Sequence, residues 1–222
     1  MGTSPDAPAS AGQLASQLLG AMAYGELSAF GRLSTDSRYA PTLHDRAVLA
    51  KIAVGAYGNF ALLNGRLSEM GTDPEEAMLP FQRAFDHFHE RTRPGDWFES
   101  VMKAYVIDTV SSDFYRTIAG FLDPGTQRLV EQVASPDQAT EVLRVLLRRA
   151  LSDDPRLASR LALWGRRLVG EALTQAQRTG LEHPLLGPLL RGGGDARAKV
   201  RRLTGELAEK HAHRMAGLGL AA

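Results

Sequence analysis

Residues 41–71 read PTLHDRAVLAKIAVGAYGNFALLNGRLSEMG and predict one long helix. Thr42 is followed three residues later by Asp45, which is the spacing of a capping box, and Pro41 prevents an earlier start. Gly71 can adopt the left-handed conformation that commonly ends a helix. At about 1.5 Å per residue the helix would be roughly 42 Å long. This length is typical of helical bundles.

The buried face predicted for this helix contains one polar side chain, Asn59. Its other members are apolar: Leu49, Ile52, Ala56, Phe60, Leu63 and Leu67. A buried amide needs hydrogen-bond partners, because an unpaired polar group is costly away from water. Asn59 is therefore either a core amide bonded to a neighbour such as Glu26, or the trace of a functional site.

The rest of the chain is predicted to be helical almost throughout, since alternation of β-branched residues is absent. Further helices are expected at about 12–33, 74–93, 96–121, 124–134, 136–151, 155–179 and 196–215. Long capped helices with short connections predict an all-α bundle with additional C-terminal helices. Residues 1–10 are expected to form a disordered lead-in, residues 11–180 the bundle, and residues 181–222 a linker and an amphipathic helix that packs on it.

Composition excludes several classes of function. The chain has 222 residues and a formal charge of +1. This net charge is too small to attract the protein as a whole to nucleic acid. Cysteine is absent, which excludes disulfides and thiolate chemistry. The basic start of the last helix lacks interleaved aromatic residues, so no nucleic-acid partner is expected. No secretory signal and no strongly apolar run of about 18 residues is evident, so a cytoplasmic protein without membrane contact is expected.

Three carboxylates are the candidate catalytic or metal-binding residues of the sequence. Glu26 falls within an apolar face, Asp113 falls within another, and Asp108 lies on a face beside that of Asp113. A buried charge is costly unless it is paired or binds a metal. Inward carboxylates on several helices build di-iron sites, in which two helices also carry Glu-x-x-His.

Four sequence segments indicate a family. They are YGELSAFGRL (24–33), FHERTRPGDWFESVMKAYV (88–106), DFYRTIAGFLDP (113–124) and RLALWGRRLVGEALTQAQR (160–178). Over roughly residues 14–180 the chain resembles ferritin-like proteins related to tRNA-modifying non-haem di-iron hydroxylases. The resemblance implies a ferritin-like four-helix bundle. For intact members it also implies a di-iron centre that activates dioxygen.

The chain departs from this family at the positions of the metal ligands. The resemblance implies Glu at position 56 and His at position 59, where this sequence has Ala56 and Asn59. It also implies a second histidine near position 139, which is Ala139 here. No Glu-x-x-His occurs; only Asp86 and His89 have ligand spacing, on a short helix predicted to lie outside the site. We therefore predict that the ordinary di-iron centre is lost.

The vacated centre is predicted to be a pocket. Its candidate catalytic residues are Glu26, Asp108 and Asp113, and its candidate substrate contacts are Tyr24, Ala56, Tyr57, Asn59 and Tyr105. An enclosed carboxylate suits general acid/base catalysis on a small molecule without a redox metal, so no cofactor is expected. The alternatives are a non-catalytic binding or scaffold protein, and an oxygenase that holds non-haem iron with altered ligands. The sequence does not decide whether the protein forms a homodimer.

Two pairs of histidines are predicted to be solvated. His87 and His89 are two residues apart, as are His211 and His213. On a helix this spacing points the two side chains of a pair to different faces. Neither pair is therefore expected to bind a metal.

Overall fold

The computed structural model describes residues 11–135, 138–182 and 195–221. Helix accounts for 86% of the structure, and no strand occurs in these ranges. The prediction of an all-α chain is therefore confirmed. The predicted lead-in at residues 1–10 and most of the linker before residue 195 lie outside the described residues.

Local chemistry sets the ends of the long helix as predicted. The helix α2 spans Leu43–Glu69, and the Thr42 hydroxyl oxygen at its start accepts a hydrogen bond from the Asp45 amide at 3.0 Å. Gly71, just past its end, has a φ of 71°, which a residue with a side chain rarely adopts. The other helices are α1 (Ala11–Asp36), α3 (Pro74–Arg91), α4 (Trp97–Ala119), α5 (Pro124–Val133), α6 (Gln138–Asp153), α7 (Leu157–Glu182) and α9 (Ala196–Gly217), with a 3-10 turn at Ser37–Tyr39.

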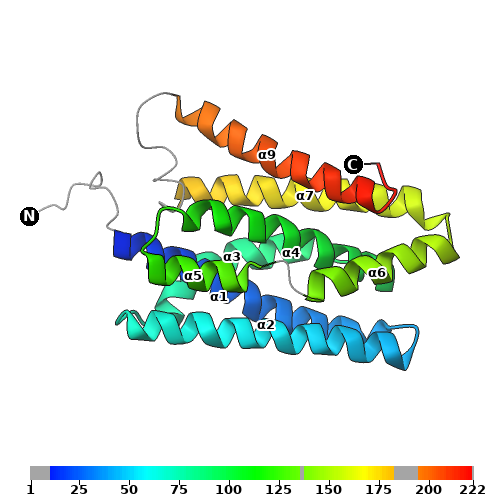
Figure 1. Ribbon diagram of the computed structural model, residues 1–222, viewed down its shortest axis with the longest axis horizontal. Coiled ribbons are helices and arrows are strands. Elements are labelled where there is room, and N and C mark those ends of the chain that lie inside the picture. The colour runs from blue at the N-terminus through cyan, green and yellow to red at the C-terminus, as the bar shows by residue number, and fades with distance from the viewer. Residues whose placement is uncertain (1–10, 136–137, 183–194, 222) are drawn as a thin grey trace, which may run out of the picture.

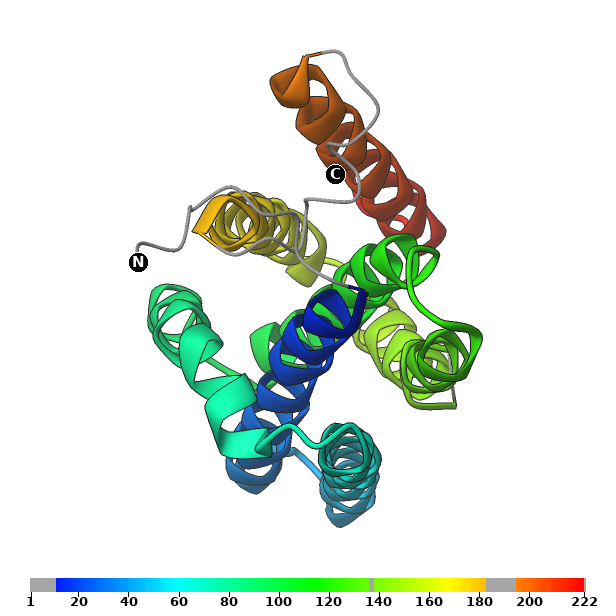
Figure 2. The same cartoon turned by 90° about the vertical axis from the view of Figure 1, so that its left-hand side faces the viewer.

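The long helices run side by side, with α2 at one edge of the molecule and α9 at the other (Figure 1). The helix α4 lies at the centre, because it contacts α1, α5, α6, α7 and α9. Seen end-on, α1 lies between α2 and the rest of the bundle (Figure 2). Both α1 and α4 therefore bury more than one face.

The helix α3 packs closely on α1 and is more than a connection. A β-carbon added at Gly20 in α1 would lie 2.1 Å from the carbonyl oxygen of Ala77 in α3. Only glycine permits this approach of the two backbones. The helix α3 was predicted to lie outside the site; it contributes side chains to a pocket of the bundle, as described below.

One face of α2 is open to solvent although it is apolar. Leu43 is 82% exposed and Val54 is 67% exposed. By length and composition α2 could cross a membrane, and most of its side chains are not buried, but one such helix is weak evidence. The absence of membrane contact stays a prediction.

The C-terminal helix α9 packs on α4 and α7. Met215 is fully buried, and its side chain lies against Gly165 of α7. His211 is 2% exposed. The prediction that His211 is solvated is therefore wrong, because this part of α9 faces the bundle.

Candidate functional site

A pocket of about 160 Å³ lies between α1, α3, α4, α5 and α7. Most of its walls are apolar, and the larger side chains among them are Met22, Phe85, Phe88, Ile107 and Phe114. Four ionisable side chains also line it: Glu26, His89, Asp108 and Tyr115. An apolar enclosure with a few polar groups is the usual form of a small-molecule site.

Glu26 and Tyr115 provide one polar region of this pocket. Burial, followed by the negative charge of Glu26, raises the pKa of the Tyr115 hydroxyl. The hydroxyl is therefore protonated at neutral pH and can donate a hydrogen bond. Sequence reasoning predicted Glu26 at the pocket but did not single out Tyr115 as a pocket residue.

His89 provides a second polar region, from α3. Burial, followed by the charges of Lys103 and Arg32, lowers the pKa of His89 to about 3. The imidazole is therefore neutral at neutral pH. The prediction of a solvated His89 is wrong. The buried Phe81 and Phe88 on the same helix were the signal that α3 has an inward face.

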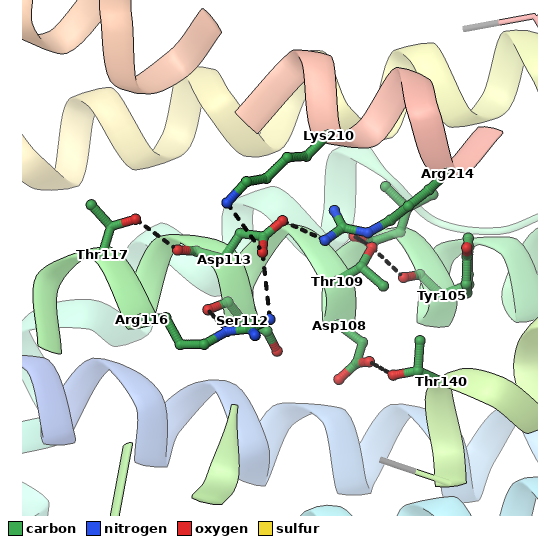
Figure 3. A network of polar contacts seen from close by, with 11 residues as sticks. Tyr105, Asp108, Thr109, Ser112, Asp113, Arg116, Thr117, Thr140, Lys210 and Arg214 are labelled. Atoms are coloured by element: carbon green, nitrogen blue, oxygen red, sulfur yellow. Dashed lines mark hydrogen bonds and ion pairs between the residues drawn. The ribbon is translucent and has the colours of Figure 1, made fainter. Parts of the chain in front are cut away.

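Asp108 and Asp113 lie on different sides of α4 (Figure 3). Asp108 lines the pocket and accepts a hydrogen bond from the Thr140 hydroxyl at 2.6 Å. Asp113 is 6% exposed and does not line this pocket. Its carboxylate forms ion pairs with Arg214 at 2.5 Å and Lys210 at 3.6 Å, both on α9, and a third with Arg116. Asp113 thus fixes α9 to α4, and its expected place in the pocket is corrected.

The candidate residues on α2 do not reach the pocket. Ala56 is buried, Asn59 is half-buried, and Tyr57 is 49% exposed with its ring 5.3 Å from that of Phe30. None of the three lines the pocket. The expectation of one shared cavity is therefore corrected: α2 packs on α1 and contributes no side chain to the pocket.

The other two tyrosines predicted to contact a substrate, Tyr24 and Tyr105, also lie outside the pocket. Tyr24 donates a hydrogen bond to Asp86 at 2.7 Å, and its ring meets the pocket-lining Phe85 edge-on at 5.8 Å. Tyr105 is buried in the core, and burial raises its pKa. Tyr24 therefore supports a wall of the pocket from behind, whereas Tyr105 belongs to the packing of the bundle.

The donor set of the described residues does not fit a di-iron centre. Such a centre needs carboxylates from several helices and two Glu-x-x-His elements. In the described part of the chain no group of three or more His, Cys, Asp or Glu side chains is placed to hold a metal ion. Asp86, which has ligand spacing to His89, bonds instead to Tyr24.

Comparisons with known proteins bear on the fold. A family model described as the ferritin-like domain of actinomycetes matches residues 11–193. No curated protein matches the chain. The match supports the ferritin-like part of the resemblance in the sequence. It does not bear on the relation to tRNA-modifying hydroxylases.

Proposed function

Because this chain belongs to the family of actinomycete ferritin-like domains, we propose that it is a member whose bundle pocket binds and converts a small molecule without a redox metal. The observation that carries this proposal is the position of Glu26. Its carboxylate lines an apolar pocket beside the buried hydroxyl of Tyr115.

The chemistry follows from these two groups. A positioned carboxylate in an apolar enclosure takes a proton from a bound molecule or returns one to it. The Tyr115 hydroxyl, held in its protonated form, donates a hydrogen bond to an oxygen of the substrate or to Glu26. Asp108, bonded to Thr140, is the other carboxylate on the pocket wall. Glu26 is therefore our candidate general acid/base.

A second candidate function is binding without catalysis. The mostly apolar walls favour this alternative, because they suit retention of an apolar molecule as well as its conversion. An oxygenase with altered iron ligands is less well supported by the donor set. The relation to tRNA-modifying hydroxylases, the cytoplasmic location, the lack of a nucleic-acid partner and a homodimer all stay predictions.

Untargeted conversion of metabolites tests the proposal. The purified protein, treated with a chelator, is incubated with a cell extract, and the small molecules are followed by mass spectrometry. We expect at least one metabolite to be consumed by the wild type and by the surface control Glu69→Gln. Turnover should fall by on the order of 100-fold in Glu26→Gln, the usual worth of a positioned proton-transfer group.

The outcomes separate the functions. Retention of a metabolite without its conversion supports the binding protein. Turnover that is lost with the chelator and restored by iron supports the oxygenase. Full activity in folded Glu26→Gln contradicts the catalytic assignment.

A further inference from the structure

A group of buried and half-buried ionisable residues adjoins the pocket at His89. It comprises Arg32 and Asp36 of α1, His89 of α3 and Lys103 of α4. Lys103 is 1% exposed, and its ammonium group donates a hydrogen bond to the Thr92 carbonyl at 2.9 Å. We call these four residues the basic cluster.

The basic cluster contains buried nitrogen atoms without hydrogen-bond partners. Nε and Nη1 of Arg32 and Nδ1 of His89 are buried and have no hydrogen-bond partner. The nearest carboxylate, Asp36, lies 4.0 Å from Arg32 Nη1, beyond hydrogen-bond distance. Asp36 accepts instead from the Ser100 hydroxyl. Buried donors of a charged group left unpaired are costly, which indicates that an acceptor is missing here.

The charges in the cluster do not cancel. Below pH 7, where Lys103 is protonated, Arg32 and Lys103 carry two positive charges and Asp36 one negative charge, while His89 is neutral. The excess is one positive charge. Burial, followed by the charge of Arg32, lowers the pKa of Lys103 to about 7. One monoanion would balance the cluster, whereas a phosphate dianion would reverse its charge.

The cluster is connected to the pocket through α3. His89 lines the pocket itself, and the pocket-lining Phe88 ring lies 5.5 Å from the Lys103 ammonium. Lys103 precedes the pocket-lining Ile107 by one helical turn. The neutral His89 therefore lies between the pocket and the positive charges of Arg32 and Lys103, which do not themselves line it. The carboxylates Glu26 and Asp108 lie elsewhere on the pocket walls.

We propose that this pocket is specific for small carboxylic acids, with the carboxylate bound by Arg32 and His89 and the apolar body between the phenylalanines. A guanidinium and a carboxylate form strong charge-assisted hydrogen bonds. In the tautomer that is protonated on Nδ1, the neutral His89 adds a donor from a second helix. The negative charges of Glu26 and Asp108 oppose the reverse orientation. The inference rests on the proposed pocket and does not depend on whether Glu26 is catalytic.

Calorimetric titration with two matched probes tests this proposal. Octanoate and octan-1-ol share the apolar chain and differ in the charged head. The wild type should bind octanoate about 10- to 100-fold more tightly than the alcohol, as expected for hydrogen bonds to a charged group. Arg32→Met should lose this preference and keep its affinity for the alcohol. The exposed Arg156→Gln serves as the control and should behave as the wild type.

Two further variants keep the test decisive. Arg32→Lys retains the charge and loses the planar fork, so it should bind octanoate several-fold more weakly even if the methionine variant does not fold. Glu26→Gln should bind octanoate at least as tightly as the wild type. Equal affinity of the wild type for both probes, or an undiminished preference in both Arg32 variants, overturns the carboxylate site and leaves the pocket in place. Failure of both probes to bind overturns the carboxylate site and also the proposed pocket.

Discussion

Lys103 makes the stability of this protein depend on pH in a defined direction. Its pKa is lowered from 10.5 to about 7 in the folded state, whereas the unfolded chain keeps the ordinary value. Between these two values the unfolded chain binds more protons, so stability rises with pH. At about 1.4 kcal/mol per pKa unit the full span is worth roughly 5 kcal/mol, of which the interval from pH 7 to pH 9 contains about 2 kcal/mol.

The substitution Lys103→Met removes the titrating group and keeps an unbranched side chain. We expect the free energy of unfolding of the wild type to rise by about 2 kcal/mol from pH 7 to pH 9, and that of Lys103→Met to stay level. Urea unfolding followed by circular dichroism at each pH measures this difference.

His89, with a pKa of about 3, is already neutral throughout the interval. Lys51→Met, on the exposed face of α2, should keep the wild-type rise. Parallel pH profiles for the wild type and Lys103→Met would refute the reasoning.

Two further predictions concern the packing of the helices. Gly20→Ala should lower the free energy of unfolding by about 2 kcal/mol, because its β-carbon would overlap the Ala77 carbonyl. Gly58→Ala, with no neighbour within 4 Å of the added carbon, should gain up to about 1 kcal/mol in the same urea titration. Asp113→Asn should cost about 2 kcal/mol and speed amide exchange in α9 while α1 is unchanged, since the ion pairs to Arg214 and Lys210 are lost. Equal exchange in α9 of the variant and the wild type would contradict that role.

The helices could be predicted because their ends are set by neighbouring residues. Thr42 and Asp45 start α2, and Asp96 starts α4 by accepting from the Glu99 amide at 2.9 Å. These bonds involve residues three apart, so the spacing in the sequence is sufficient. The buried face of α7, with Leu161 and Leu168 fully buried, follows from helical period in the same way.

The pocket could be predicted only in part, because periodicity shows which residues are buried but not against which helix. Ala56 and Glu26 both lie on faces predicted to point inward, yet only Glu26 lines the pocket. Nothing in the sequence placed Asp108 rather than Asp113 in the pocket. The packing of α9 on α4 decides this, because Asp113 pairs with side chains of α9. Lys103 gave no signal, since a lysine is ordinarily exposed and only the helices around α4 bury it.

Iron content tests most directly the claim that this is a ferritin-like protein whose pocket works without a di-iron centre. The protein is expressed with ample iron, dialysed and analysed by plasma mass spectrometry and absorption spectroscopy. Because the described donor set does not fit such a centre, we expect well under one iron per chain and no ferric carboxylate band. Two tightly bound irons per chain would contradict the account.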